Sequence, residues 1–168
     1  MHSIRFQFIA FITALLLVLL ILLNTYPMVN SRDAVFEEKR SSMTGQASTV
    51  SSTLSSLERL SPENIAEVLR YLDLSAYSRV MVTDRAGLVL YDTAGAAGET
   101  AGAEDIFTCL EGKTVFRSSF SEESFDSSVA MPLSSQGELT GAVYLTEHDG
   151  ERAEIILGFQ RRIRAASL

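Results

Sequence analysis

The stretch RVMVTDRAGLVLYDT, residues 79–93, decides the fold of this chain. Two runs rich in β-branched and aliphatic residues, 79–83 and 88–91, lie on either side of the four-residue turn Asp84-Arg-Ala-Gly87. Short runs of this kind around a glycine-containing turn are typical of a β-hairpin. The stretch therefore predicts two adjacent antiparallel strands.

Three further strand signals follow the hairpin, at 114–120, 128–133 and 139–146. The last two flank Ser134-Ser-Gln-Gly-Glu138, which reads as a second hairpin connection. A short helix is expected at 104–110. Strands that cluster after helices and are joined by short turns favour an α+β fold with an antiparallel sheet.

Between the first hairpin and the short helix, residues 93–102 contain three Gly and four Ala and no bulky side chain. This composition predicts a mobile loop. Upstream of the hairpin, Ser61 can cap a helix that has Pro62 at its first position. An apolar stripe follows at helical spacing, so we expect an amphipathic helix over 62–73; the stripe is formed by Ile65, Val68, Leu69 and Leu72.

A longer helix is predicted over residues 30–60, where apolar residues form a heptad seam. The seam consists of Phe36, Met43, Ala47, Val50, Leu54 and Leu57. It suits a dimer helix that pairs with a second copy, or a helix packed only on its own domain. Ten of the sixteen residues 41–56 are Ser or Thr, which are weak helix formers, so a flexible stalk is a third alternative.

Residues Phe6 to Leu23 are apolar apart from Gln7 and Thr13 and carry no charge. As a helix they extend ~27 Å, close to the ~30 Å hydrocarbon core of a bilayer. We therefore expect residues 1–29 to hold a cytoplasmic N-terminus and an uncleaved transmembrane anchor, with the later residues extracytoplasmic. A cleaved signal peptide and a buried core helix are the alternatives.

The charge pattern excludes nucleic acid as the main partner, because the formal net charge is −7 and phosphate binding needs a basic face. Residues 84–151 hold 13 acidic and three basic side chains. A solvated surface explains this excess. The sharper alternative is an acidic patch, Glu122, Glu123 and Asp126, that divalent cations or polyamines bridge; no spacing resembles a calcium loop.

Catalytic motifs are lacking in the sequence, which has no G-x-S-x-G and no serine–histidine–aspartate pattern, and it implies no cofactor. His148 is expected at the surface. The lone Cys109 excludes a disulfide framework and a multi-cysteine metal site. Its place on the inner face of a short helix favours a buried, inert thiol, with a thiol sensor as the alternative.

A small-molecule pocket is expected where the glycine-rich loop meets the sheet. Tyr91, Asp92 and Thr93 lead into that loop, and Arg117 and Phe120 lie on the next strand. Arg117 is a rare base in an acidic module and could pair an anionic ligand. The alternative for Arg117 is a salt bridge to Asp92 or to another acid.

Two motifs carry a resemblance. They are Val82-Thr-Asp-x-x-Gly87-x-Val89-x-Tyr91-Asp92 and Gly137-x-x-x-Gly141-x-Val143. With the order of the expected elements, they resemble the extracytoplasmic PAS-like (single Cache) sensor domains of bacterial membrane receptors, particularly two-component sensor histidine kinases. The resemblance implies a five-stranded antiparallel sheet with the long helix behind it and a small-ligand pocket in front.

The resemblance divides the chain into the anchor, the long helix, a sensor domain at 61–147 and an exit helix at 148–168. The exit helix carries Arg161, Arg162 and Arg164, which could meet lipid headgroups or form an ordinary solvated helix end. A second apolar run, a phosphoacceptor histidine segment and an ATP-binding box are missing, so we expect a fragment or short relative of a longer receptor.

The expected function is signal sensing for a histidine kinase that lies outside this chain, as a homodimer that responds to a small molecule or an envelope stimulus. The same input module on a chemoreceptor or cyclic-dinucleotide enzyme is one alternative. A stand-alone membrane-anchored binding module is another.

Overall fold

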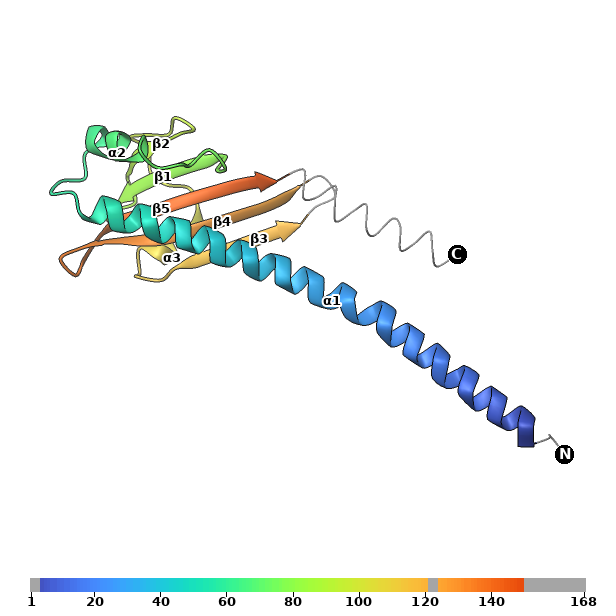
Figure 1. Ribbon diagram of the computed structural model, residues 1–168. Helices are drawn as coiled ribbons and strands as arrows, with labels where there is room; N and C mark the ends of the chain where they lie inside the picture. Colours follow the sequence, from blue (N-terminus) through green and yellow to red (C-terminus); the bar gives the residue numbers. More distant parts are fainter. Residues whose placement is uncertain (1–3, 121–123, 150–168) are drawn as a thin grey trace. The chain divides into compact units, whose positions relative to one another are not determined.

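The computed structural model describes residues 4–120 and 124–149. The chain divides into two units, residues 1–39 and 40–168, and the second unit holds the sheet. Three helices are described, α1 (Ile4–Ser55), α2 (Pro62–Leu69) and α3 (Glu104–Cys109) (Figure 1). The predicted exit helix from residue 150 onward, with its arginine cluster, lies outside the described residues.

Five antiparallel strands form one sheet in the order β2-β1-β5-β4-β3. The strands are β1 (Arg79–Asp84), β2 (Val89–Asp92), β3 (Val115–Phe120), β4 (Phe125–Ser135) and β5 (Glu138–Asp149). The predicted α+β fold with a five-stranded antiparallel sheet is confirmed. The last strand, β5, lies at the centre of the sheet, and it continues through His148 and Asp149, where the exit helix was expected to begin.

The first hairpin forms as the sequence indicates, and a carboxylate holds its turn. Asp84 Oδ1 accepts hydrogen bonds from the backbone N–H groups of Ala86 (2.8 Å) and Leu88 (2.9 Å). Gly87 adopts φ +82°, a conformation that side chains disfavour. These two residues let β1 turn directly into β2.

The connection between β4 and β5 is tighter than predicted. Ser135 pairs with Glu138, so Gln136 and Gly137 alone form the turn. Both have positive φ values, 53° and 84°, which is the backbone of a type I′ turn. That geometry matches the twist of the two long strands, which are paired from Phe125 to Ser135 with one register shift between Leu133 and Ser134.

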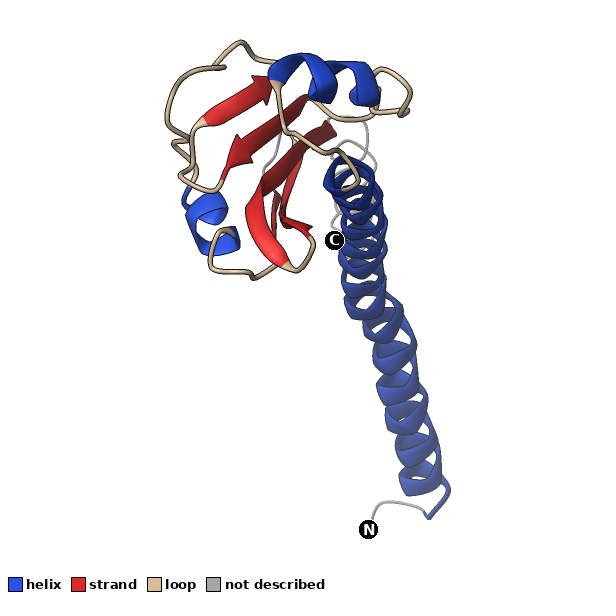
Figure 2. Cartoon of the chain, turned by 90° about the vertical axis from the view of Figure 1, so that its left-hand side faces the viewer, coloured by secondary structure: helices blue, strands red, loops and turns tan. Residues whose placement is uncertain are grey.

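One face of the sheet packs against the C-terminal part of α1 and against α2 (Figure 2). Four residues of the predicted seam are buried there, each no more than 1% exposed: Met43, Ala47, Val50 and Leu54. They share a core cluster with Val129 and Val143 of the sheet. The Ser51 hydroxyl also donates a hydrogen bond of 2.8 Å to the backbone oxygen of Pro132 on β4. These four seam residues therefore belong to the chain's own core, as the alternative of a helix packed on its own domain predicts.

The serine- and threonine-rich part of α1 is helical up to Ser55 and is not a flexible stalk. Its hydroxyl groups bond to carbonyl groups of the preceding turn, as Thr49 does to Gly45 (3.1 Å) and Thr53 to Thr49 (2.7 Å). These bonds satisfy the hydroxyl groups inside the helix. Burial of the apolar seam then outweighs the weak helix propensity.

Two local predictions need correction. The helix expected over 62–73 ends at Leu69, four residues early. The loop at 93–102 is fastened to the edge of the sheet rather than left mobile, because three backbone bonds of 2.8–2.9 Å join it to residues 87–89. Leu88 and Thr100 form an isolated bridge there. Small residues allow this close approach of two backbone segments.

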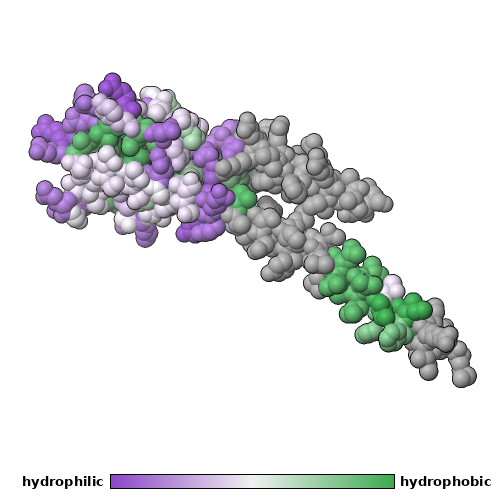
Figure 3. All heavy atoms as spheres, viewed as in Figure 1, coloured by the Kyte–Doolittle hydropathy of each residue, from purple (hydrophilic) through white to green (hydrophobic). Residues whose placement is uncertain are grey.

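The first unit contains the N-terminal part of α1, whose apolar side chains are exposed (Figure 3). Those large side chains are between 41% and 68% exposed: Phe8, Ile9, Phe11, Ile12 and the residues 15–21. Over the described residues, no helix combines the length and the hydropathy that crossing a bilayer requires.

A glycine at the centre of the sheet supplies the first prediction. A Cβ atom at Gly141 would lie 1.9 Å from the backbone oxygen of Thr83 on β1, whereas one at Gly45 in α1 meets nothing within 4 Å. We expect Gly141→Ala to lower the free energy of unfolding by about 3 kcal/mol or more, because neither strand can move aside. Gly45→Ala should raise it by about 0.5–1 kcal/mol. Urea titration measures both, and equal midpoints for the two variants would contradict the close approach.

Candidate ligand groove

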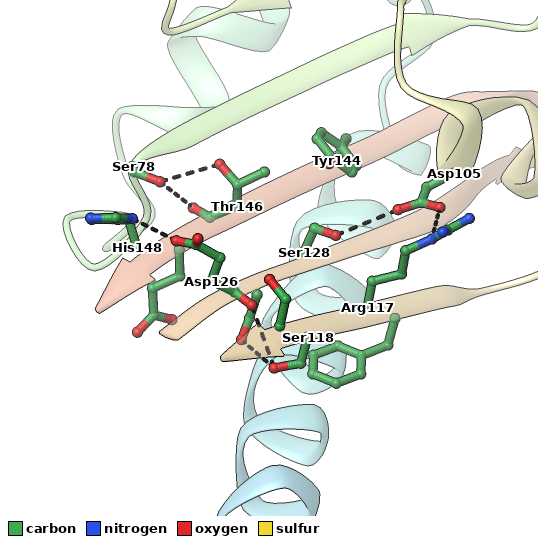
Figure 4. Close-up of a pocket in the computed structure, with 13 residues that line it drawn as sticks. Ser78, Asp105, Arg117, Ser118, Asp126, Ser128, Tyr144, Thr146 and His148 are labelled. Carbon is green, nitrogen blue, oxygen red and sulfur yellow. Dashed lines mark hydrogen bonds and ion pairs between the residues drawn. The ribbon is translucent and has the colours of Figure 1, made fainter. Parts of the chain in front are cut away.

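A groove of about 810 Å³ lies over β3, β4 and β5, and Figure 4 shows its charged and hydroxyl side chains with α1 behind the sheet. We call this hollow the groove. Its lining consists of Ser78, Asp105, Phe116, Arg117, Ser118, Ser119, Asp126, Ser127, Ser128, Tyr144, Thr146, Glu147 and His148.

Strand alternation explains why the groove is polar. Successive side chains of a strand point to opposite faces. On β5, Val143 and Leu145 belong to the core that α1 covers, whereas Tyr144 and Thr146 line the groove. On β4 the same alternation places Ser128 opposite Thr146. Ser128, Tyr144 and Thr146 therefore lie on the sheet face that α1 leaves uncovered, while Phe116 of the same lining also packs against the core.

At one end of the groove, α3 places a buried carboxylate against an exposed arginine. The Asp105 side chain is 9% exposed and forms an ion pair with Arg117 Nε of β3. Arg117 Nη2 also lies 3.6 Å from an oxygen of Glu104, whose side chain is 86% exposed. On the other side, the Ser128 hydroxyl donates to Asp105 Oδ2 at 3.5 Å. At this end of the groove, Arg117 therefore lies beside two carboxylates, the buried one of Asp105 and the exposed one of Glu104.

The other end is formed by a cross-strand pair between β4 and β5. Asp126 and His148 face each other in register, and Asp126 Oδ1 lies 2.5 Å from His148 Nδ1. Asp126 Oδ2 accepts from the Ser124 hydroxyl at 2.9 Å. The bonds from Ser124 and then from His148 hold the pKa of Asp126 below its usual value. His148 lies at the surface and is 62% exposed.

Hydroxyl groups line the floor between these ends. Ser78 donates to the backbone oxygen of Thr146 (3.1 Å) and lies 3.2 Å from its hydroxyl. Such groups can donate or accept, so they suit a polar ligand of either charge. The groove thus has the composition of a site for a small polar molecule, with orienting charges at its two ends.

The sequence matches no protein-family model and no curated protein. Solved structures do share the fold. The ligand-binding domain of the amino acid chemoreceptor PctC from Pseudomonas aeruginosa PAO1, in complex with GABA, superposes with a TM-score of 0.57 at 18% identity, over 77% of this chain and 59% of that one. This chain shares the fold of that ligand-binding domain.

Two further sensor structures agree on the fold. An extracellular ligand-binding receptor from Desulfohalobium retbaense gives a TM-score of 0.53 at 17% identity, over 77% of this chain and 25% of that one. The ligand-binding domain of Mlp24 with asparagine also gives 0.53, at 16% identity, over 71% and 53%. This chain therefore spans less than two thirds of the length of each of the three neighbours.

The second unit does not bring the predicted pocket residues together. Tyr91 and Asp92 lie on β2, at one edge of the sheet, and Thr93 follows them, whereas Arg117 and Phe120 lie on β3 at the other edge. The loop next to β2 completes that edge and leaves the groove uncovered. Among those of the five whose side chains the structure describes, Arg117 alone is in the groove lining. Its ion pair is with another acid, Asp105, and not with Asp92.

Asp92 and Thr93 have structural roles in the second unit. Arg79 donates to both carboxylate oxygens of Asp92, at 2.9 and 2.7 Å, and the backbone N–H groups of Ala94 and Ala96 donate to them at 3.1 Å. The Thr93 hydroxyl accepts from the backbone N–H of Val80. Together these bonds secure the edge strand and the start of the loop.

The remaining candidates are resolved in part. Glu122 and Glu123 of the proposed acidic patch lie outside the described residues, and Asp126 is engaged by His148 and Ser124. Among the described residues, no group of three potential metal ligands occurs. Cys109 is fully buried, and burial raises the pKa of its thiol to about 12, as in the inert alternative.

Sequence reasoning missed Asp105, Ser128, Tyr144 and Thr146 of the groove. The available signal was strand alternation: in 126–133, Val129 and Leu133 alternate with polar positions such as Ser128. That alternation predicts one polar sheet face. It does not indicate that Asp105, on a helix, would lie over this face.

The second prediction concerns the pH dependence that Asp92 confers. The two hydrogen bonds from Arg79, and then those from Ala94 and Ala96, lower the pKa of Asp92 to about 2, below the ~3.9 of an unfolded chain. Its stabilisation is therefore present above about pH 4 and is lost as the pH falls from 4 to 2.

We expect Asp92→Asn to lower the free energy of unfolding by about 2 kcal/mol at pH 7 and by much less at pH 2. Urea titrations at both pH values check this, with Glu99→Gln on the next loop as the control for loss of a carboxylate. A cost for Asp92→Asn that does not change with pH would show that Arg79 does not stabilise the ionised form.

Proposed function

We propose that this chain is the extracytoplasmic signal-sensing input region of a membrane receptor, and that the groove binds its small-molecule stimulus. The observation that carries the proposal is the groove itself, which lies on the uncovered sheet face and combines a buried carboxylate with charged and hydroxyl side chains. Structural polar groups do not need such an opening, whereas ligand sites do.

The structural neighbours support a small polar stimulus. The PctC domain is described in complex with GABA and the Mlp24 domain with asparagine, both small molecules with charged groups. At 16–18% identity these neighbours share a fold with this chain.

Signal transfer follows from the shared strands. The residues of β5 alternate between the core that α1 covers and the groove, so a ligand that shifts β5 also changes its packing on α1. A ligand that favours one of two such packings would move α1 relative to the sheet. In this proposal that movement passes to a cytoplasmic histidine kinase outside the chain. A chemoreceptor output is the second candidate, since PctC is a chemoreceptor.

The exposed apolar side chains of the first unit support a membrane anchor over residues 6–23. Soluble domains rarely expose a contiguous apolar surface of this kind, so it needs a cover. A lipid bilayer would bury this surface, and residues 6–23 carry no charge that would oppose insertion into it. The short N-terminus would then be cytoplasmic and the sensor domain extracytoplasmic.

A homodimer remains part of the proposal, but with a changed surface. The seam residues Met43, Ala47, Val50 and Leu54 are buried within one chain. Two copies would therefore meet through the side of α1 that faces away from the sheet.

The third prediction tests ligand binding in the groove with a substitution that fills it. We expect Ser128→Phe to abolish the thermal stabilisation that a ligand gives, because the ring would occupy the floor of the groove. Ser134→Phe, an exposed position on the same strand, is the matched control and should keep the response. Tm is measured on the full chain with GABA, asparagine and a panel of small polar metabolites; a ligand at 100 times its Kd stabilises by about 2.7 kcal/mol. A response that persists in Ser128→Phe, or none with any compound, would contradict the proposal.

The fourth prediction tests membrane insertion of residues 6–23 by placing a charged side chain among them. Leu16→Arg places a charge at the centre of the run, which costs about 2.5–3.5 kcal/mol in a bilayer. We expect the variant to leave the membrane fraction after a carbonate wash, whereas Ser48→Arg, at an exposed position of α1 in the second unit, should stay with it. Equal retention of the two variants would count against a membrane-spanning anchor.

A further inference from the structure

The Asp105 carboxylate needs a cation where it lies. Its side chain is 9% exposed, and an ionised carboxylate at that depth is costly unless it is paired. Oδ2 accepts a long bond from Ser128, and Oδ1 makes no hydrogen bond within the described residues apart from its ion pair with Arg117 Nε. The stability of this end of the groove therefore depends on a positive charge beside Asp105.

The cation that Asp105 now has comes from an exposed side chain. Arg117 is 59% exposed, and its Nη2 atom lies 3.6 Å from Glu104, an acid at the surface. If Arg117 moves away from Asp105, Glu104 can keep it paired in solvent. After this move Arg117 still has a counter-charge, whereas Asp105 needs another cation.

Electrostatics of the groove favour a positive ligand. Its described lining contains three carboxylates, of Asp105, Asp126 and Glu147, and Arg117 as its one permanent cation. An anion that bound Arg117 would come close to Asp105 and Glu104, or would take Arg117 away and leave Asp105 buried without a counter-charge. A cation meets neither penalty, because it can replace Arg117 at Asp105.

We propose that the groove binds a small organic cation bearing a primary amine, whose ammonium group displaces Arg117 from Asp105. The ammonium donates to Asp105 and to the Ser128 hydroxyl, and Arg117 transfers to Glu104. In the structure the Arg117 guanidinium therefore occupies the position beside Asp105 that the proposal gives to the ligand's ammonium group. This inference rests on the proposed function of the groove as the ligand site and names the chemical class that the site accepts.

The test uses three four-carbon compounds that differ mainly in charge: putrescine, GABA and succinate. Their binding to the full chain, purified in detergent, is measured by isothermal titration calorimetry. We expect putrescine to bind most tightly and succinate most weakly. If succinate binds more tightly than putrescine, the cation class is wrong, while ligand binding in the groove still stands.

Two variants locate the ammonium group. Asp105→Asn should weaken putrescine binding by about tenfold or more, because a charged hydrogen bond contributes ~1.5–3 kcal/mol. Glu111→Gln removes an exposed carboxylate beyond α3 and should change the affinity by less than about twofold. An unchanged affinity in Asp105→Asn would overturn the inference.

Arg117→Gln should change the putrescine affinity in the opposite direction from Asp105→Asn. It removes the internal competitor, so putrescine binding should strengthen by about two- to fivefold. A purely structural role for the Asp105–Arg117 pair predicts weaker binding instead, and a role in anion binding predicts loss of succinate binding. Either of these results overturns the proposal, and neither depends on whether Asp105→Asn folds.

Discussion

The packing of α1 on one face of the sheet is the constraint on which the rest of the domain depends. Met43, Ala47, Val50 and Leu54 are almost completely buried against strands β1, β4 and β5. A sheet has two faces, and this packing takes one of them. Ser128, Tyr144 and Thr146 of the central strands lie on the other face, where α3 covers part of the surface and the groove lies beside it.

The central strand connects the two faces. β5 lies between β1 and β4, so it cannot shift without both neighbours, and Gly141 brings its backbone close to β1. Val143 and Leu145 meet the core beneath α1, while Tyr144 and Thr146 line the groove. A change at the groove is therefore one residue away from the core under the long helix. This adjacency links the groove directly to the core under α1.

Local features were the ones that sequence reasoning predicted well. The first hairpin follows from Asp84 and Gly87, since the carboxylate and the glycine act within their own turn. The heptad seam identified which side of α1 is buried, because helical spacing depends on the chain alone. What buries that side was left open between a second copy and the chain's own sheet. The answer required knowing where β4 and β5 lie.

The sequence by itself determined the strands, the turns, the apolar sides of the helices and the acidic charge of the module, because each depends on residues close together in the chain. Tertiary structure alone decided the pairing of charges. Arg117 is paired with Asp105, and Asp92 is held by Arg79 on the neighbouring strand. Ion pairs act over a few ångströms in space, and strand order and helix placement set those distances. For the same reason, the groove appeared only once α3 was placed beside β3 and β4.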